Sequence, residues 1–333
     1  MKRLIIVFLI IFAAFYAKRA SANDEAQAVL AGKINAAYIA QTGDPVFTPN
    51  MGLIKLGEPS YDGTFYAVYN KNGKKLIYLA AQHGAPKTLN MVYHIFEKYK
   101  PDVAVVEFER EDRPLKDHAY EVPLTAKLAI KNKIPFVKAD LATDDWYQVL
   151  KLDNYSYNDF QGFMIIRTLF AGDYPGRKTA AEQLEITQHL FNKDLGKRLT
   201  PEGFLDWFKT HFKGDYYKID LPNLRPNPYA PSLEGFITNR MSLRVSLKGR
   251  DPFMLANIAA ALNKKEYDTV FMVSGGGHYD SLAPALEKML GKPKIIKEIK
   301  KNYAVAPADG KSILTPKTEV LVPFDEFADK YLK

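Results

Sequence analysis

Residues 267–278 constrain the fold of this chain more than any other stretch. An apolar run at 269–273 leads, after one serine, to three consecutive glycines and then to His278. Residues 280–291 begin with helix-capping residues and end on glycine, which predicts a helix, and 294–296 predict another strand. This order predicts a strand–helix–strand unit with a parallel, buried sheet. His278 is expected at the carboxyl end of its strand, where open α/β sheets bind ligands.

A second unit of the same kind is predicted nearer the start of the chain. Residues 75–81 form a β-like run that is followed at once by Gln-His-Gly, with His83 in the middle. A helix is expected over 88–99, and a buried strand over 103–109 carries Glu107 near its end. Both units therefore place polar side chains where an apolar strand stops.

The whole pattern predicts an α/β fold with a mostly parallel central sheet flanked by helices, and with a helical insertion between the two βαβ halves. The mature chain, 23–333, is expected to be a single domain. Its core comprises about 64–140 and 247–333, and the insertion, about 141–246, is rich in aromatic and charged residues. At the start of the second core segment, Asp251 is predicted to cap a helix.

The first 22 residues have the pattern of an export signal. Lys2 and Arg3 precede an apolar run of 14 residues, 4–17. A membrane span needs roughly twenty residues, so no stable membrane span is expected. The Ala-Ser-Ala at 20–22 predicts cleavage and a protein that is periplasmic or secreted, with an uncleaved N-terminal anchor as the alternative.

Charge and cysteine content exclude several classes of protein. The formal net charge of +8 includes four basic residues of the signal, and without them 42 basic residues stand against 38 acidic ones. Such a surface does not favour nucleic-acid binding. The chain has no cysteine, which excludes disulfides, thiolate metal ligands and a cysteine nucleophile. A Gly-x-Ser-x-Gly serine-hydrolase elbow is absent as well.

Polar side chains from three strands are expected to meet at the carboxyl edge of the sheet. They are His83, His278, and Glu107 together with Glu109, which share one side of their strand because strand side chains alternate. Two imidazoles and a carboxylate suit a divalent metal ion with open positions. A histidine and a glutamate can instead activate water without a metal, the histidine as base and the glutamate orienting it.

Structural roles are the alternatives for each candidate. A single histidine at a strand end is often only hydrogen-bonded. Glu107 follows four apolar residues, and burying a carboxylate is costly without a partner, so it is either functional or paired with a cation such as Arg110. Arg240, Arg244 and Arg250 form a basic series that fits an anionic group, although a solvated helix face explains the first two.

Two motifs resemble a known group of families. The run Arg-Asp-Pro-Phe-Met at 250–254 heads a predicted helix, and the strand that ends in Gly-Gly-Gly-His at 275–278 follows it. This pair resembles the closing motif of the superfamily of Tiki and TraB proteins, erythromycin esterases and haem-binding ChaN proteins, which share an Arg-Asp/Asn-x-x-Met helix and a strand ending in Gly-x-x-His. The strand before His83 and the Glu-Phe-Glu at 107–109 resemble their opening motifs.

The resemblance covers roughly residues 74–110 and 248–297, and it implies cleavage of a peptide or ester bond. The leading hypothesis is an exported hydrolase, dependent on a divalent metal ion, that acts on a small-molecule or peptide substrate. It would activate water at His83, Glu107 and His278, which would also be the metal ligands.

Further residues complete this hypothesis. Arg250 would hold an anion or a carbonyl oxygen, and Glu109 and Asp251 would have secondary roles. One alternative is an exported protein that binds haem or a metal without catalysis, and another is an inactive domain that binds a partner. For haem, the apolar wall would come from aromatic residues of the insertion: Tyr216, Tyr217, Tyr229 and Phe236.

Overall fold

The computed structural model describes residues 47–56, 63–109, 120–169, 178–191, 195–219, 236–304, 308–311, 313 and 317–331. The expected signal peptide, 1–22, lies outside these residues, and so do Arg110 and Tyr229.

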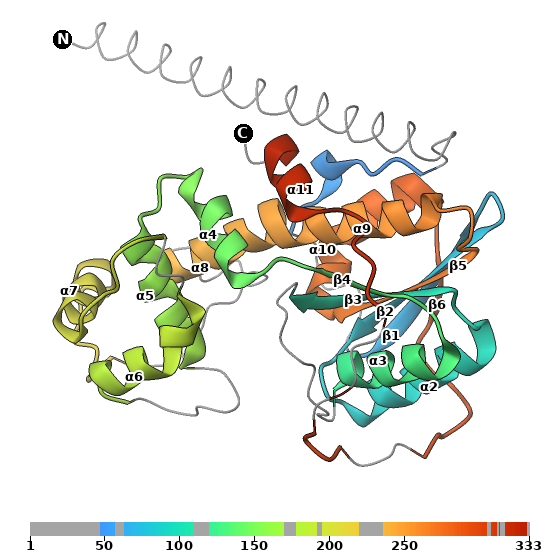
Figure 1. The fold of residues 1–333 in the computed structure, drawn as a ribbon, viewed down its shortest axis with the longest axis horizontal. Helices are drawn as coiled ribbons and strands as arrows, with labels where there is room; N and C mark the ends of the chain where they lie inside the picture. Colours follow the sequence, from blue (N-terminus) through green and yellow to red (C-terminus); the bar gives the residue numbers. More distant parts are fainter. Residues whose placement is uncertain are drawn as a thin grey trace, which may run out of the picture.

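A six-stranded sheet forms the centre of the molecule, in the strand order β4-β3-β5-β2-β1-β6 (Figure 1). Strands β2 to β5 run parallel, and β1 pairs antiparallel with both β2 and β6. This confirms the predicted α/β fold with a mostly parallel sheet. The strands are β1 (Phe65–Lys71), β2 (Lys74–Ala81), β3 (Val103–Glu109), β4 (Phe136–Asp140), β5 (Thr269–Gly275) and β6 (Lys294–Ile296).

Strand β5 lies between β2 and β3, although it comes from the far end of the chain. Ala81 of β2 is level with Gly275 of β5, and Val106 of β3 is level with Val273 of β5. The three strands therefore end together at one edge of the sheet. The short strand β6 pairs only with β1, at the outer edge, so it does not lie beside β5.

Helices cover both faces of the sheet, because successive strand side chains point to opposite sides. Ile77 and Leu79 pack with α2 (Pro86–Tyr99) and α3 (Glu121–Asn132) on one face. Leu76 and Tyr78 pack with α9 (Asp251–Asn263) and α10 (Gly276–Leu290) on the other. The near-continuous apolar sequence of β2 and β5 follows from burial on both faces.

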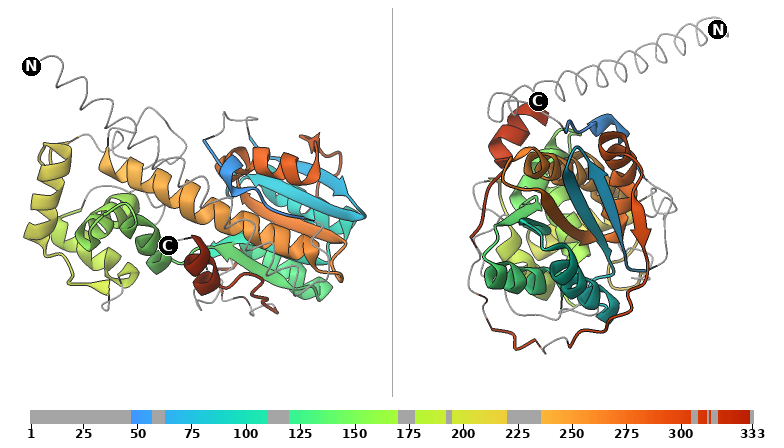
Figure 2. Two further views of the ribbon diagram at one scale, coloured as in Figure 1. Left: turned by 90° about the horizontal axis from the view of Figure 1, so that it is seen from above. Right: turned by 90° about the vertical axis from the view of Figure 1, so that its right-hand side faces the viewer.

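The predicted helical insertion forms a lobe beyond the edge where β3 and β4 end (Figures 1 and 2). Its core is aromatic: Phe204, Phe208 and Tyr216 have ring centroids 5.2–6.2 Å apart. Its helices are α4 (Thr143–Lys151), α5 (Tyr157–Thr168), α6 (Ala180–Thr187), α7 (Pro201–Phe212) and α8 (Ile237–Val245). Short elements complete the described chain: η1 (Met51–Leu53), η2 (Gln188–Leu190) and α11 (Phe324–Tyr331).

The lobe is joined to the sheet by one unbroken helical run, α8–η6–α9, in which η6 (Ser246–Arg250) is a single π-helical turn (Figure 2). The predicted helix start with Asp251 as its cap is therefore wrong, because Arg250 and Asp251 both have right-handed helical backbone and no side-chain cap. Gly249 lets this turn pack closely, since a Cβ there would lie 2.9 Å from the side chains of Leu141 and Val149. Single π-helical turns are frequent at functional sites.

The position of His278 also differs from the prediction. Helix α10 begins at Gly276 and not near residue 280, so His278 lies in its first turn and is 4 % exposed. The glycines belong to the end of β5 and the start of the helix, with Gly275 as N-cap. Within the described residues, no helix is long and apolar enough to cross a membrane.

Gly162→Ala is expected to destabilise the helical lobe. A Cβ at this position of α5 would lie 2.5 Å from the indole of Trp207, whose Nε1 donates a hydrogen bond to Asp159 at 2.9 Å and so holds the ring in place. Overpacking of this kind costs about 1–3 kcal/mol. Thermal unfolding followed by circular dichroism measures the loss.

Gly203→Ala is the matched control in the same lobe, because its Cβ would meet no atom closer than 3.4 Å. This variant should stay within about 0.5 kcal/mol of the wild type. Equal stability of the two variants would contradict the proposed packing of α5 against α7.

Candidate functional site

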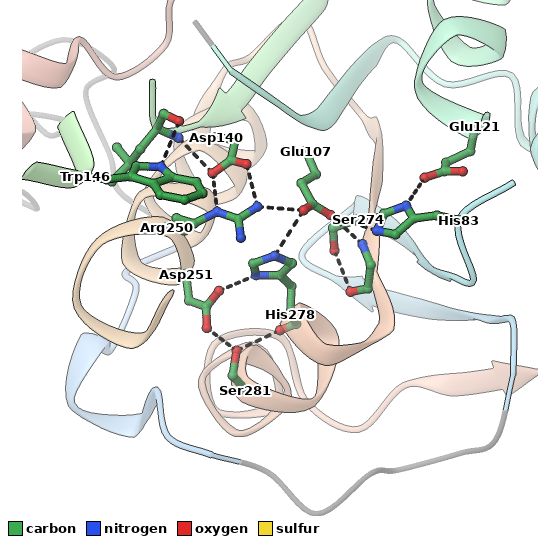
Figure 3. A network of polar contacts seen from close by, with 12 residues as sticks. His83, Glu107, Glu121, Asp140, Trp146, Arg250, Asp251, Ser274, His278 and Ser281 are labelled. Atoms are coloured by element: carbon green, nitrogen blue, oxygen red, sulfur yellow. Dashed lines mark hydrogen bonds and ion pairs between the residues drawn. The ribbon is translucent and has the colours of Figure 1, made fainter. Parts of the chain in front are cut away.

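The site lies where β2, β5 and β3 end, and Glu107 is at its centre (Figure 3). Its Oε1 accepts hydrogen bonds from Arg250 Nη2 at 2.7 Å and His278 Nε2 at 3.1 Å. Its Oε2 accepts the backbone N–H of Gly275 at 2.6 Å. The side chain is 13 % exposed. Burial raises the pKa of Glu107, but the charges of His278 and Arg250 outweigh burial and hold that pKa well below its usual range.

Arg250 is held from three sides. Its Nε and Nη2 donate to the two carboxylate oxygens of Asp140 at 2.8 and 2.6 Å, and Nη2 also reaches Glu107. The ring of Trp146, from α4 of the lobe, lies 5.3 Å from the guanidinium carbon. The sequence predicts a substrate-binding role for Arg250; in the structure its Nε and Nη2 are bonded to Asp140, and Nη2 also holds Glu107.

His278 is the most buried imidazole of the site. Its Nδ1 donates to Asp251, and the second oxygen of Asp251 accepts the hydroxyl of Ser281 at 2.5 Å. Burial lowers the pKa of His278, but the carboxylates of Glu107 and Asp251 more than offset burial and raise it to about 9. Without a competing cation, this imidazole is protonated at neutral pH.

His83 is the most open residue of the site, with 53 % of its side chain exposed. It lies two residues beyond β2, and its Nδ1 contacts Glu121 Oε1 at 2.5 Å. This bond is the main reason that the pKa of His83 is raised, and Glu107 adds to the effect. The other ring nitrogen, Nε2, lies 3.9 Å from Glu107 Oε2.

Gly275 allows His83 to lie close to the backbone at the end of β5. A Cβ at position 275 would lie 2.8 Å from His83 Nε2 and 3.5 Å from Glu107 Oε2. The absence of a Cβ at residue 275 therefore lets the His83 ring pack against the backbone, next to the carboxylate of Glu107.

The cluster holds more acidic than basic groups. With both imidazoles neutral, its one guanidinium leaves three of the four carboxylate charges unbalanced. Two protons on the imidazoles, or one divalent cation between them, would balance two of these charges. The four carboxylates are those of Glu107, Glu121, Asp140 and Asp251.

The residue types suit a metal ion. In each imidazole a carboxylate holds one ring nitrogen, an arrangement that is usual for metal-bound histidines. Among the described residues, however, no group of three or more His, Asp or Glu side chains is placed to hold a metal ion as it stands. The 3.9 Å between His83 Nε2 and Glu107 Oε2 is the longest link in the set.

The structure brings together five of the six predicted site residues. Glu109 pairs through its backbone register with Asp140 of β4, and its side chain lies outside the described residues. The sequence prediction did not include four residues that contribute to the site, although Asp140, like Glu107, is a carboxylate near the end of a strand. The four are Glu121, Asp140, Trp146 and Ser281.

Of the aromatic residues expected to wall a haem site, Tyr216 lies in the interior of the lobe, Phe236 is partly buried and Tyr217 is 46 % exposed. Tyr216 is 1 % exposed and donates to the carbonyl of Lys178, and Phe236 stacks on Phe212 with centroids 5.7 Å apart. Tyr217 packs against Tyr216. The contacts of these described aromatics are with other residues of the lobe.

Comparison of the chain with family models, curated proteins and solved structures finds no match. The resemblance to the Tiki, TraB, erythromycin esterase and ChaN families therefore stays a prediction from the two motifs. Function has to be inferred from the geometry of the site.

Gly275→Ala is expected to displace His83 without unfolding the protein. The new Cβ would stand 2.8 Å from Nε2, and the half-exposed ring can turn into solvent to avoid it. The ¹⁵N NMR signals of the His83 ring should shift, while the melting temperature changes by no more than about 2 °C. In the matched control Gly276→Ala, the Cβ would meet only the carbonyl of Ala81 at 3.9 Å, so an equal shift there would contradict this reading.

The stability of the metal-free protein is expected to fall with rising pH. The folded pKa of His278, about 9, lies above the unfolded value of 6.5, so its proton stabilises the fold fully below pH 6.5. That contribution is lost as pH rises through about 9, by an amount on the order of 1–3 kcal/mol. His83 acts in the same direction because its pKa is also raised.

Urea unfolding between about pH 6 and 10 measures this loss. His278→Gln should lower stability at acidic pH and flatten most of the dependence. A wild-type free energy of unfolding that stays constant over the window would refute the assignment.

Proposed function

We propose that this chain is a hydrolase that activates water at His83, Glu107 and His278, with a divalent metal ion as cofactor. The observation that carries the proposal is that two imidazoles, one just beyond β2 and one in the first turn of α10, direct Nε2 toward one buried carboxylate. Each ring is held at Nδ1 by a further carboxylate, Glu121 or Asp251. A fixed pair of nitrogen donors around one carboxylate is a common way to build a water-activating centre.

The residues of the site would have separate roles in this reaction. Glu107 and the Nε2 atoms of His83 and His278 would hold the metal, which lowers the pKa of a bound water when present. When no metal is bound, His83 is instead the residue placed to accept a proton at Nε2, because its ring is half-exposed to solvent. Arg250, fixed by Asp140, keeps Glu107 charged and aimed into the centre.

A hydrolytic role is favoured over haem binding by the surroundings of the histidines. The groups around them are charged and hydrogen-bonded, whereas a haem site needs a broad apolar wall. The motif resemblance supports a peptide or ester bond as the one cleaved. Export by the N-terminal segment is part of the same proposal and places the substrate outside the cytoplasm.

His83→Gln is expected to abolish hydrolysis and to weaken Co²⁺ binding at least about 100-fold, because it removes one donor of three. The side chain is half-exposed, so the fold should survive. Metal content, Co²⁺ absorption and turnover of chromogenic esters and peptides are the measurements. Metal affinity should also rise between about pH 6.5 and about 9, since protons compete for His278 over that range.

His94→Gln is the matched control, since His94 lies on α2 and contacts Tyr303 at 3.3 Å, away from the cluster. It should keep metal binding and activity. Activity that survives chelation but is lost in His83→Gln would remove the metal from the proposal and leave His83 as a metal-free base. A His83→Gln protein as active as the wild type would refute the proposed function.

A further inference from the structure

Glu121 is a buried acid that the sequence did not associate with the site. It is the first residue of α3 and is 1 % exposed. It lies on the opposite side of the cluster from Asp251, which holds the other histidine (Figure 3). A glutamate buried this deeply needs hydrogen-bond partners to offset the loss of its hydration.

Both oxygens of Glu121 are used by the loop that carries His83. Oε1 contacts His83 Nδ1 at 2.5 Å, and Oε2 accepts the backbone N–H of Gly84 at 3.2 Å. Gly84 has a φ of +70°, a conformation that favours glycine and that turns this N–H toward the carboxylate. The carboxylate also lies at the N-terminus of α3, where a helix stabilises negative charge.

This geometry determines which nitrogen of His83 carries its proton when the ring is neutral. A carboxylate accepts and does not donate, so the Nδ1 that faces Glu121 must bear the hydrogen. The lone pair is then on Nε2, the nitrogen that lies 3.9 Å from Glu107 Oε2 and close to the backbone of Gly275. Without Glu121 the neutral ring would favour the opposite tautomer, with its hydrogen on Nε2.

We propose that Glu121 is the positioning residue of His83: it fixes the tautomer and orientation that make Nε2 the free donor atom. The effect of this positioning on metal binding and hydrolysis rests on the proposed function, whereas the tautomer of His83 does not depend on any reaction. A purely structural pair between Glu121 and a half-exposed histidine would instead contribute mainly to stability.

Long-range ¹H–¹⁵N correlation spectra of the chelator-treated protein test the proposal, recorded on the alkaline side of the His83 titration. His83 is identified by the signals missing from His83→Gln. The wild-type ring should be in the Nδ1–H form, and Glu121→Gln should shift it toward Nε2–H. Calorimetry should show Co²⁺ affinity about 10- to 100-fold lower in Glu121→Gln.

Two further variants make the result decisive. Glu121→Asp keeps the negative charge at the start of α3 but is one methylene too short to reach His83, so it should give the same change if Glu121→Gln does not fold. Glu97→Gln is the control, because this glutamate pairs with Lys301 on the surface and should leave the tautomer and the affinity unchanged.

The outcomes separate this inference from the proposed function. A wild type without Co²⁺ binding but with a tautomer that depends on Glu121 supports the positioning role and removes the metal from the function. Co²⁺ bound through His83, with tautomer and affinity unaffected in Glu121→Gln, overturns the positioning role and leaves the function standing. A wild-type ring in the Nε2–H form overturns it whatever the variants do.

Discussion

The structure of the site depends on one buried carboxylate. Glu107 is a charged side chain near the end of an apolar strand. Its charge is stable there only because Arg250, His278 and the backbone N–H of Gly275 all donate hydrogen bonds to it. The two side-chain donors are each held in turn by another group, Asp140 for the guanidinium and Asp251 for the imidazole. The result is a chain of alternating negative and positive groups, so removing one of them leaves the charges of its neighbours unbalanced.

The two histidines are held alike but are placed differently. His278 is buried between two carboxylates and has its pKa raised to about 9, so it behaves as a fixed cation in the absence of metal. His83 is half-exposed and contacts solvent. The site thus contains a buried imidazole, whose protonation is set by the neighbouring carboxylates, and an exposed imidazole that can exchange protons with water. Water-activating centres need both properties.

The sequence predicted what depends on local pattern and missed what depends on tertiary contacts. Apolar runs that end in His83, Glu107 and the glycines before His278 identified the edge of the sheet correctly. Asp251 was misread as a helix cap because Asp-Pro is a strong start signal, whereas the helix continues through a π-helical turn. No local sequence pattern marked Glu121 as a site residue, because it reaches His83 through the packing of α3 against α2.

The place of β5 between β2 and β3 has a consequence for how the molecule assembles. Until residue 275 has been synthesised, β2 and β3 have no partner on the sides that face each other. The inner edges of these strands are then open to pairing with another chain, a known hazard for aggregation. Closing the sheet also brings Gly275 to Glu107 and so completes the site. Completion of the sheet and completion of the site therefore depend on the same strand, β5.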